Sequence, residues 1–137
     1  MLTKKYLKEL TYDVIGAAIE VQKTNGPGLL ESVYQKCMEE ELILRKIHFE
    51  SELTVPIHYK DKSIDTEFRC DLFVEKCLVL ELKSVESIQP LHKAQIMTYM
   101  KLLNSPKGIL INFNSLNLFS EGQLTFVNEM FRNLPDE

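Results

Sequence analysis

Residues 67–83 read EFRCDLFVEKCLVLELK, and this stretch decides the fold. Apolar side chains occupy alternate positions in its first half, and Leu78, Leu80 and Leu82 alternate with other residues in its second half. A period of two places successive side chains on opposite faces of a strand. The stretch therefore predicts two antiparallel strands, Glu67–Val74 and Cys77–Lys83, around a tight turn at Glu75-Lys76.

The register of this strand pair follows from its apolar face. In the first strand that face consists of the even-numbered residues Phe68, Cys70, Leu72 and Val74. Pairing Val74 with Leu78 keeps this face opposite the leucines of the second strand, whereas a shorter connection mixes apolar and charged faces. In that register Asp71 lies opposite Glu81, with Lys83 on the same face. Opposed like charges destabilise a sheet, so we expect solvent, a basic side chain or a cation to offset the pair.

Helical and strand patterns surround this pair. Apolar residues recur at three- and four-residue steps in Thr3–Thr24 and Leu29–Arg45, which predicts two helices separated by Asn25-Gly26-Pro27-Gly28. Pro90 suits the first position of a third helix, expected from Pro90 or Leu91 to about Leu103. We also expect an edge hairpin from Val55 with a turn near Asp61-Lys62-Ser63, strands at Gly108–Phe113 and Gln123–Val127, and a frayed tail at Asn133–Glu137. This order predicts one mixed α/β domain over residues 1–137, with helices covering a central sheet.

Composition excludes several classes of protein. The chain has 137 residues, of which 45% are apolar and 26% charged, as expected for a soluble protein with one core. No apolar run is long enough to span a bilayer or to form a signal peptide, so we expect a cytoplasmic location. The net charge of −4 argues against a nucleic-acid coat protein, although acidic metal ligands also lower the sum.

The cysteines do not indicate a metal site or a disulfide framework. Cys37, Cys70 and Cys77 are odd in number and include no Cys-x-x-Cys pair. Zinc sites and four-cysteine iron–sulfur clusters need more ligands than these. We expect three reduced cysteines in the core.

Glu31 conflicts with a simple division between an apolar inside and a polar outside. Helical geometry places it on or beside the apolar stripe of Tyr34, Met38 and Leu42 in the second helix. A buried carboxylate needs a partner. The alternative is that Glu31 lies in the first turn and only complements the helix dipole.

A polar pair lies on the third helix. Gln95 and Tyr99 are four residues apart and so share one helix face. Together they are suited to orienting water or phosphate. The alternative is an ordinary helix surface with a half-buried tyrosine.

The acidic residues suggest chemistry with a hard cation. Glu31, Asp71 and Glu81 offer oxygen ligands, which suit Mg²⁺ or Mn²⁺ rather than zinc. Such an ion lowers the pKa of a bound water and stabilises charge on a phosphate. Lys83, two residues after Glu81, is placed to hold the attacking water or a phosphoryl oxygen. Hydrolysis of a phosphodiester is the natural reaction for this set.

These residues resemble a known nuclease pattern. Asp71 followed by Glu81-Leu82-Lys83 resembles the D…(D/E)-x-K core of the PD-(D/E)xK nuclease superfamily. The sequence GLLESVY at 28–34 resembles the signature of its small bacterial GxxExxY proteins, and Gln95-x-x-x-Tyr99 resembles an element of its exonuclease-like and helicase-associated branches. The resemblance extends from the first helix through Phe113. Cys70 stands where the superfamily's name has a proline.

The resemblance implies a restriction-endonuclease-like fold, with a mixed sheet flanked by helices, and metal-dependent cleavage of DNA. It implies that Glu31, Asp71, Glu81 and the backbone carbonyl of Leu82 bind Mg²⁺ or Mn²⁺. It further implies the following roles in the reaction: Lys83 as the catalytic lysine, and Gln95 and Tyr99 as supports for the substrate or the attacking water.

We therefore expect a Mg²⁺-dependent deoxyribonuclease whose partner is DNA, with a homodimer or a protein partner supplying any sequence specificity. One alternative is a nuclease-fold protein that binds nucleic acid or a protein without cleaving. Another is a structural subunit whose paired carboxylates bind a stray cation. The lysines of the first helix, Lys4, Lys5, Lys8 and Lys23, form either a basic edge for DNA or an ordinary solvated face.

Overall fold

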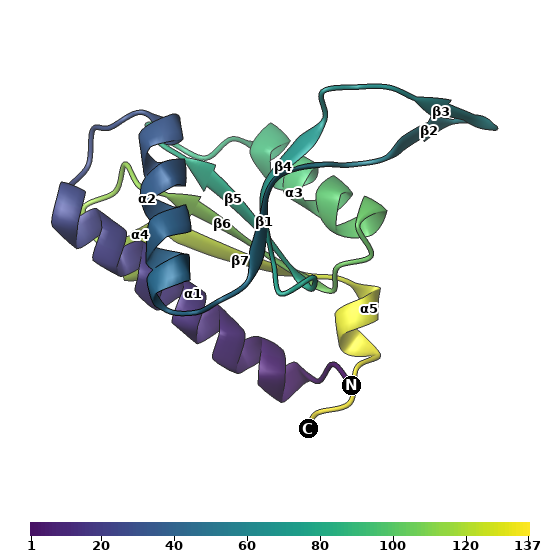
Figure 1. Ribbon diagram of the computed structural model, residues 1–137, viewed down its shortest axis with the longest axis horizontal. Coiled ribbons are helices and arrows are strands. Elements are labelled where there is room, and N and C mark those ends of the chain that lie inside the picture. Colours follow the sequence, from purple (N-terminus) through teal and green to yellow (C-terminus); the bar gives the residue numbers. More distant parts are fainter.

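The computed structural model describes all 137 residues and contains five helices and seven strands (Figure 1). The helices are α1 (Lys4–Asn25), α2 (Glu31–Leu44), α3 (Pro90–Leu102), α4 (Leu118–Glu121) and α5 (Glu129–Arg132). The strands are β1 (Phe49–Thr54), β2 (Ile57–Tyr59), β3 (Lys62–Ile64), β4 (Arg69–Val74), β5 (Leu78–Lys83), β6 (Lys107–Asn112) and β7 (Gln123–Val127). None of the helices has the length and apolar character needed to cross a membrane.

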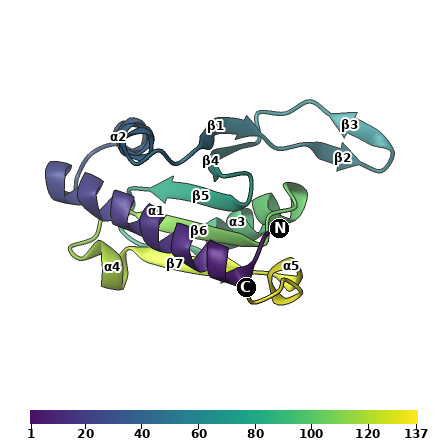
Figure 2. The ribbon, with the colours of Figure 1, turned by 60° about the horizontal axis from the view of Figure 1, so that its bottom comes forward.

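Five strands form a central mixed sheet in the order β1-β4-β5-β6-β7. β5 and β6 run parallel, and all other neighbours run antiparallel. α3 connects β5 to β6 and packs on one face, whereas α1 and α2 pack on the other (Figure 2). This arrangement confirms the predicted restriction-endonuclease-like α/β fold, in which helices cover both faces of a mixed sheet.

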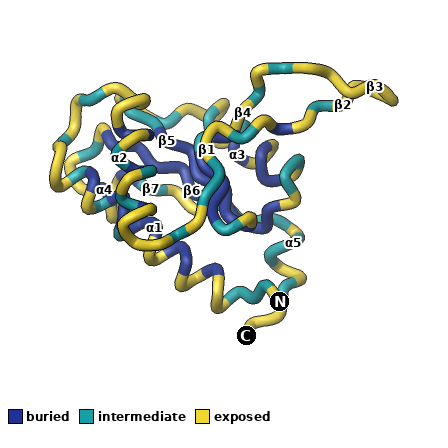
Figure 3. The backbone as a smooth tube through the Cα atoms, viewed as in Figure 1, coloured by how far each residue is buried: buried dark blue, intermediate teal, exposed yellow.

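Two apolar clusters fill the two faces. The larger lies between α1, α2 and the sheet, and it contains the stacked rings of Tyr34 and Phe113, whose centroids are 4.3 Å apart. The smaller lies under α3 and includes Phe73, Val79 and Met100. Buried residues concentrate on β5 and β6 in the middle of the sheet (Figure 3). Close packing on both faces therefore fixes the strand that carries Glu81 and Lys83.

The register predicted for β4 and β5 is confirmed. Val74 pairs with Leu78, and Leu72 pairs with Leu80. Apolar burial selects this register, because a slip by one residue would turn the leucines that pack against α1 and α2 toward the opposite face of the sheet.

The predicted apolar face of β4 is wrong in its first half. Cys70 packs in the cluster under α3 together with Phe73, whereas Leu72 packs on the opposite face. The alternation therefore changes phase at Asp71. The ladder pairs on either side leave Asp71 and Glu52 between them unpaired, and Glu52 has a left-handed backbone with φ 53°. An irregularity of this kind bends a strand and redirects its side chains.

The predicted hairpin forms a separate two-stranded sheet of β2 and β3. It projects from the body of the molecule beyond the ends of β1 and β4 (Figures 1 and 2). Val55, at its base, is buried, and Tyr59 near its tip is exposed.

The end of the chain is more ordered than the sequence predicts. α5 follows β7, and the next residues lie against the start of α1, where the Lys4 and Lys5 amides donate to the Pro135 and Asp136 carbonyls at 2.9 and 3.0 Å. These bonds satisfy two of the amides that a helix N-terminus leaves without an intrahelical acceptor. The predicted fraying is therefore wrong. All three cysteines are free, but only two are buried: Cys70 and Cys77 lie in the core, and Cys37 is half-buried.

Candidate active site

The candidate site lies where β4 and β5 stop pairing as a regular ladder. The Asp71 amide donates to Oε2 of Glu81 at 2.8 Å, and the Leu82 amide donates to Oδ2 of Asp71 at 2.7 Å. Each carboxylate thus accepts a hydrogen bond from the backbone of the neighbouring strand. Short bonds to a charged acceptor are among the stronger ones in proteins. This reciprocal pair holds both acids in one orientation.

The two acids are held in a poorly solvated place. Glu81 is only 4% exposed, and Asp71 is half-buried. Burial, followed by the negative charge of Asp71, raises the pKa of Glu81 well above its ordinary value. Burial also raises the pKa of Asp71, although the Leu82 amide and the positive charge of Lys83 oppose that shift. Burial therefore works against full ionisation of the pair, and a nearby cation would favour it.

Glu31 joins this region from α2. It is the first residue of the helix, and its Oε2 accepts from the Ser84 amide at 3.2 Å. The Ser84 hydroxyl donates in turn to the Leu29 carbonyl at 2.8 Å. These contacts tie the start of α2 to the segment that follows β5. Glu31 is exposed and lies in the first turn of α2, so the interpretation as a buried carboxylate is wrong and the alternative position in the first turn is confirmed.

A cavity of about 290 Å³ brings part of the predicted set together. Its lining residues are Glu31, Ser32, Gln35, Glu52, Asp71 and Leu82. Three predicted metal ligands, Glu31, Asp71 and Leu82, therefore share one cavity. Glu81 does not line it, although its Oε2 accepts from the amide of Asp71.

Two lining residues were not predicted from the sequence. Gln35 is buried, and its Nε2 donates to the Asp71 carbonyl at 2.9 Å. It lies four residues after Glu31, so helix spacing offered a signal for it. Glu52 enters the cavity because β1 is irregular opposite Asp71. No sequence pattern indicated that irregularity.

Lys83 lies close enough to both acids for its charge to lower their pKa values. Its side chain makes no ion pair, and its carbonyl accepts from the Phe113 amide at 2.9 Å. The ammonium group therefore offsets the acids electrostatically without being bound to either.

The predicted pair on α3 faces the same acids from the other side of the sheet. Nε2 of Gln95 donates to the Tyr99 hydroxyl at 3.1 Å. Tyr99 is 3% exposed, and its pKa is raised by burial and by the charges of Glu81 and Asp71. The hydroxyl is therefore kept in its protonated form, in which it can donate a hydrogen bond.

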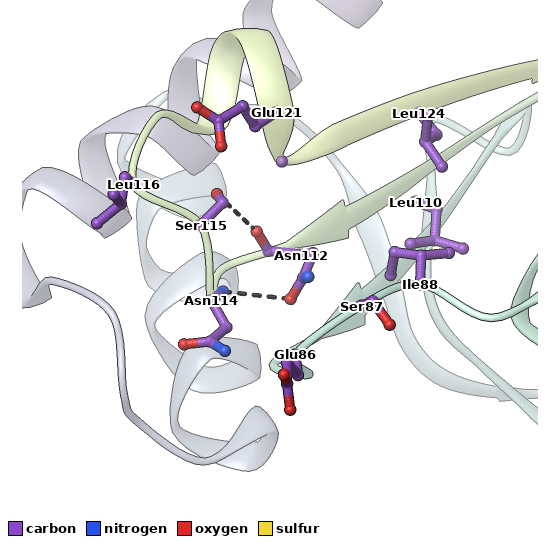
Figure 4. A pocket seen from close by; sticks show the side chains of 11 residues that line it. Glu86, Ser87, Ile88, Leu110, Asn112, Asn114, Ser115, Leu116, Glu121 and Leu124 are labelled. Carbon is purple, nitrogen blue, oxygen red and sulfur yellow. Dashed lines mark hydrogen bonds between the residues drawn. The ribbon is translucent and has the colours of Figure 1, made fainter.

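A second cavity, of about 350 Å³, lies near the end of the sheet at which β5 and β6 finish (Figure 4). Oδ1 of Asn112 accepts from the amides of Val85 and Asn114 at 3.1 and 3.2 Å, and its Nδ2 donates to the Val85 carbonyl at 2.9 Å. One buried amide side chain thus fixes the segment between β5 and α3. The hydrogen-bonding groups of this side chain are occupied within the chain, so Asn112 supports the fold here and offers no free group to a ligand.

The residues around the cavity offer few ligands for a metal ion. No three His, Cys, Asp or Glu side chains form a group that could hold an ion. Mg²⁺ usually takes one or two carboxylates and completes its shell with water and substrate phosphate. Glu31, Asp71 and the Leu82 carbonyl supply oxygen only, and the buried acids lack a full counter-charge. These oxygen donors would suit a hard divalent cation only if water and substrate phosphate completed its coordination shell.

Most of the chain resembles one known protein family. A family model described as the PD-(D/E)XK nuclease superfamily matches residues 8–123. This chain belongs to the PD-(D/E)XK nuclease superfamily. The match spans every candidate residue, from Glu31 on α2 to Tyr99 on α3. No curated protein and no solved structure matches the chain.

Membership supports a nuclease-type function, that is, hydrolysis of phosphodiester bonds. Nucleases of this superfamily generally use divalent metals, in agreement with the oxygen donors around Asp71. Cys70, directly before Asp71, packs in the cluster under α3.

Proposed function

We propose that this PD-(D/E)XK protein is a cytoplasmic deoxyribonuclease that hydrolyses DNA with Mg²⁺ or Mn²⁺. The observation that carries the proposal is the reciprocal bonding of Asp71 and Glu81 to each other's strand beside the cavity that Glu31 lines. Two acids held together by burial and backbone bonds, with a lysine nearby, form a site suited to a cation and a phosphate.

In this proposal Glu31, Asp71, Glu81 and the Leu82 carbonyl hold the ion. When bound, the ion supplies a more acidic water and neutralises charge on the scissile phosphate. Gln35 holds the backbone of Asp71 in place through its bond to the carbonyl. Asp71 stays aimed into the cavity because both its carboxylate and its carbonyl are bonded.

Lys83 is proposed as the catalytic lysine. Its ammonium group makes no ion pair within the chain and lies within electrostatic reach of both acids. It is therefore available to orient the attacking water or to contact a phosphoryl oxygen. Gln95 and Tyr99 support the substrate or that water, with Gln95 holding the Tyr99 hydroxyl.

We place the chain in the GxxExxY branch of the superfamily, and each motif residue has a physical role that supports this placement. Gly28 has φ 98°, a backbone conformation that favours glycine. The Tyr34 hydroxyl donates to the Gly26 carbonyl and accepts from the Leu29 amide, which closes the segment before α2. The motif therefore fixes the position from which Glu31 reaches the cavity.

A protein that binds nucleic acid or a protein partner without cleaving is the second candidate. It is favoured by the absence of a three-ligand group and by the position of Glu81 outside the cavity. Under this alternative the acids serve the fold rather than a reaction. A homodimer or a partner protein would supply sequence specificity under either candidate.

Cleavage of plasmid and linear DNA, and of RNA, with Mg²⁺ or Mn²⁺ tests the proposal. Wild-type protein should cut DNA, and Glu81→Gln should not. Glu40→Gln is the matched control, because Glu40 is an exposed glutamate of α2 away from the cavity. Equal DNA integrity with wild type and Glu81→Gln, across lengths and end types, would favour the binding candidate. Cleavage of RNA alone would overturn the DNA assignment.

A further inference from the structure

A second charged cavity, of about 480 Å³, lies at the opposite end of the sheet from Lys83. Four lysines, Lys4, Lys5, Lys8 and Lys107, line it with Phe131 and the acidic residues 136–137. Lys107 pairs with Leu78 at the start of β5, whereas Lys83 ends that strand five residues later. At a rise of about 3.3 Å per residue, the two ends are roughly 17 Å apart along the strands. We call this cavity the distal lysine cavity.

Lys107 is the unusual member of the cavity. The residue is 8% exposed, yet its ammonium group has no hydrogen bond and no ion pair within the chain. Its nearest compensation is the Phe131 ring, whose centroid lies 5.7 Å from Nζ. Lys4 lies over the same ring at 5.7 Å, so two ammonium groups share one aromatic partner. Burial lowers the pKa of Lys107.

The acids near the cavity compensate it weakly. Oδ1 of Asp136 lies 3.7 Å from Nζ of Lys4, and the Asp136 side chain is 89% exposed. Exposed pairs of this kind contribute little to stability. The first turn of α1 contains no acidic residue. A more highly charged anion can therefore displace the Asp136 and Glu137 side chains from the lysines.

We propose that the distal lysine cavity binds a phosphate group of a nucleic acid whose chain also reaches the acidic site. The ligand chemistry follows from several ammonium donors around one opening, which suits a multiply charged oxyanion better than a single carboxylate. The nucleic-acid source rests on the proposed function. A free phosphate compound shares this chemistry, and the experiment separates the two sources. With about 3.4 Å per base step, a duplex of about six base pairs or more spans the roughly 17 Å between the two ends.

Binding of a labelled duplex of about 20 base pairs, measured by fluorescence anisotropy in EDTA over a series of salt concentrations, tests the proposal. EDTA removes divalent ions and so prevents metal-dependent cleavage. The measured DNA affinity therefore does not depend on whether the proposed nuclease activity exists. Lys107→Met should weaken binding roughly five- to tenfold and lower the slope of log Kobs against log salt by about one. Lys62→Gln is the matched control, because Lys62 is an exposed lysine of β3 that does not line the distal lysine cavity.

Two further variants separate binding from folding. Lys107→Arg keeps the charge and should retain most of the affinity. Asp136→Asn combined with Glu137→Gln should tighten binding roughly two- to threefold, because it removes the competing carboxylates. Thermal unfolding should show all variants folded. Duplexes shorter than about six base pairs should not discriminate Lys107→Met from wild type.

Inorganic phosphate, titrated into wild type and Lys107→Met and followed by NMR, identifies the source of the ligand. Shifts at Phe131 that disappear in Lys107→Met, together with weakened DNA binding, support a nucleic-acid phosphate. The same shifts with unchanged DNA binding support a phosphate site whose ligand is a small molecule. Unchanged DNA affinity without any phosphate-dependent shift overturns the proposal. An equal loss of affinity in Lys62→Gln and Lys107→Met also overturns it, because the effect would then come from general charge rather than from a site.

Discussion

The two ends of β5 bury charge of opposite sign in different ways. At the acidic end, Asp71 and Glu81 accept hydrogen bonds from the amides of each other's strand. At the lysine end, Lys107 has only an aromatic ring beside its ammonium group. The acids are thus oriented by the backbone before any ligand arrives, whereas the lysine is held by packing. The acidic end suits chemistry that needs fixed geometry, and the lysine end suits contact with an anion.

The largest expected effect lies at the acidic end. Asp71→Asn should lower the rate of DNA cleavage by about 10³-fold or more, because it removes a proposed ligand and the charge opposite Glu81. Initial rates on linear DNA with Mg²⁺ measure this, with Glu40→Gln as the control. The rate with Asp71→Asn should fall while DNA affinity in EDTA stays within about twofold. If cleavage persists, the acids are not catalytic and the comparison of the two ends loses its functional meaning.

The second prediction concerns pH and stability in EDTA. A carboxyl group whose pKa is higher in the folded than in the unfolded state binds its proton more tightly when folded. The raised pKa values of Asp71 and Glu81 therefore make the free energy of unfolding fall as pH rises from roughly 4, the ordinary carboxyl range, through the raised folded values. The fall should be on the order of a few kcal/mol. Urea unfolding between about pH 5 and about pH 9 measures it.

Lys107 should act in the opposite direction at higher pH. Its lowered pKa means that the unfolded chain binds the proton more tightly, so the contribution of Lys107 to stability should rise as pH passes through the folded value toward the ordinary lysine range near about 10.4. In the same range the raised pKa values of Cys70, Cys77 and Tyr99 lower stability. Glu81→Gln should therefore reduce the fall at neutral pH, and Lys107→Met should make the alkaline fall steeper. If neither variant changes the pH dependence of the free energy of unfolding, Glu81 and Lys107 do not titrate with shifted pKa values at the two ends of the sheet.

The third prediction tests the support from α3. Tyr99→Phe removes the hydroxyl that Gln95 holds and should reduce cleavage roughly tenfold, with DNA affinity nearly unchanged. A purely structural tyrosine would instead lower the melting temperature and leave the cleavage rate per folded molecule unaltered. Cleavage rates normalised to the folded fraction distinguish these outcomes.

The smallest expected effect is on stability at the lysine end. Lys107→Met should raise the free energy of unfolding at neutral pH by about 1 kcal/mol, because a charge of low solvent exposure is replaced by an apolar side chain of similar length. Equilibrium urea unfolding without DNA measures this. A destabilisation of similar size would mean that the ring of Phe131 compensates the ammonium group fully.

The sequence predicted what depends on periodicity. Burial of one apolar face selected the pairing of Val74 with Leu78, and this register brought Asp71 next to Glu81. The spacing of Gln95 and Tyr99 similarly predicted a pair that the structure joins by a hydrogen bond. These features follow from local geometry, which a single sequence encodes directly.

What the sequence did not predict depends on departures from periodicity and on distant contacts. The phase change at Asp71 moves Cys70 to the other face, and strict alternation cannot indicate it. Glu52 enters the cavity through an irregular backbone. The ordered end of the chain depends on amides of α1 more than 100 residues away, and no local pattern records those partners.

The conformation of the backbone between β4 and β5 also depends on the carboxylates of Asp71 and Glu81. Because the side chains take up amides at the point where the two strands stop pairing, their loss would leave those amides without acceptors inside the protein. In a related sequence without both acids, we expect the amides of β4 and β5 to bond to carbonyls of the neighbouring strand instead, which would extend the ladder between the two strands. The unpaired ends of β4 and β5 should therefore occur only in sequences that retain the two acids.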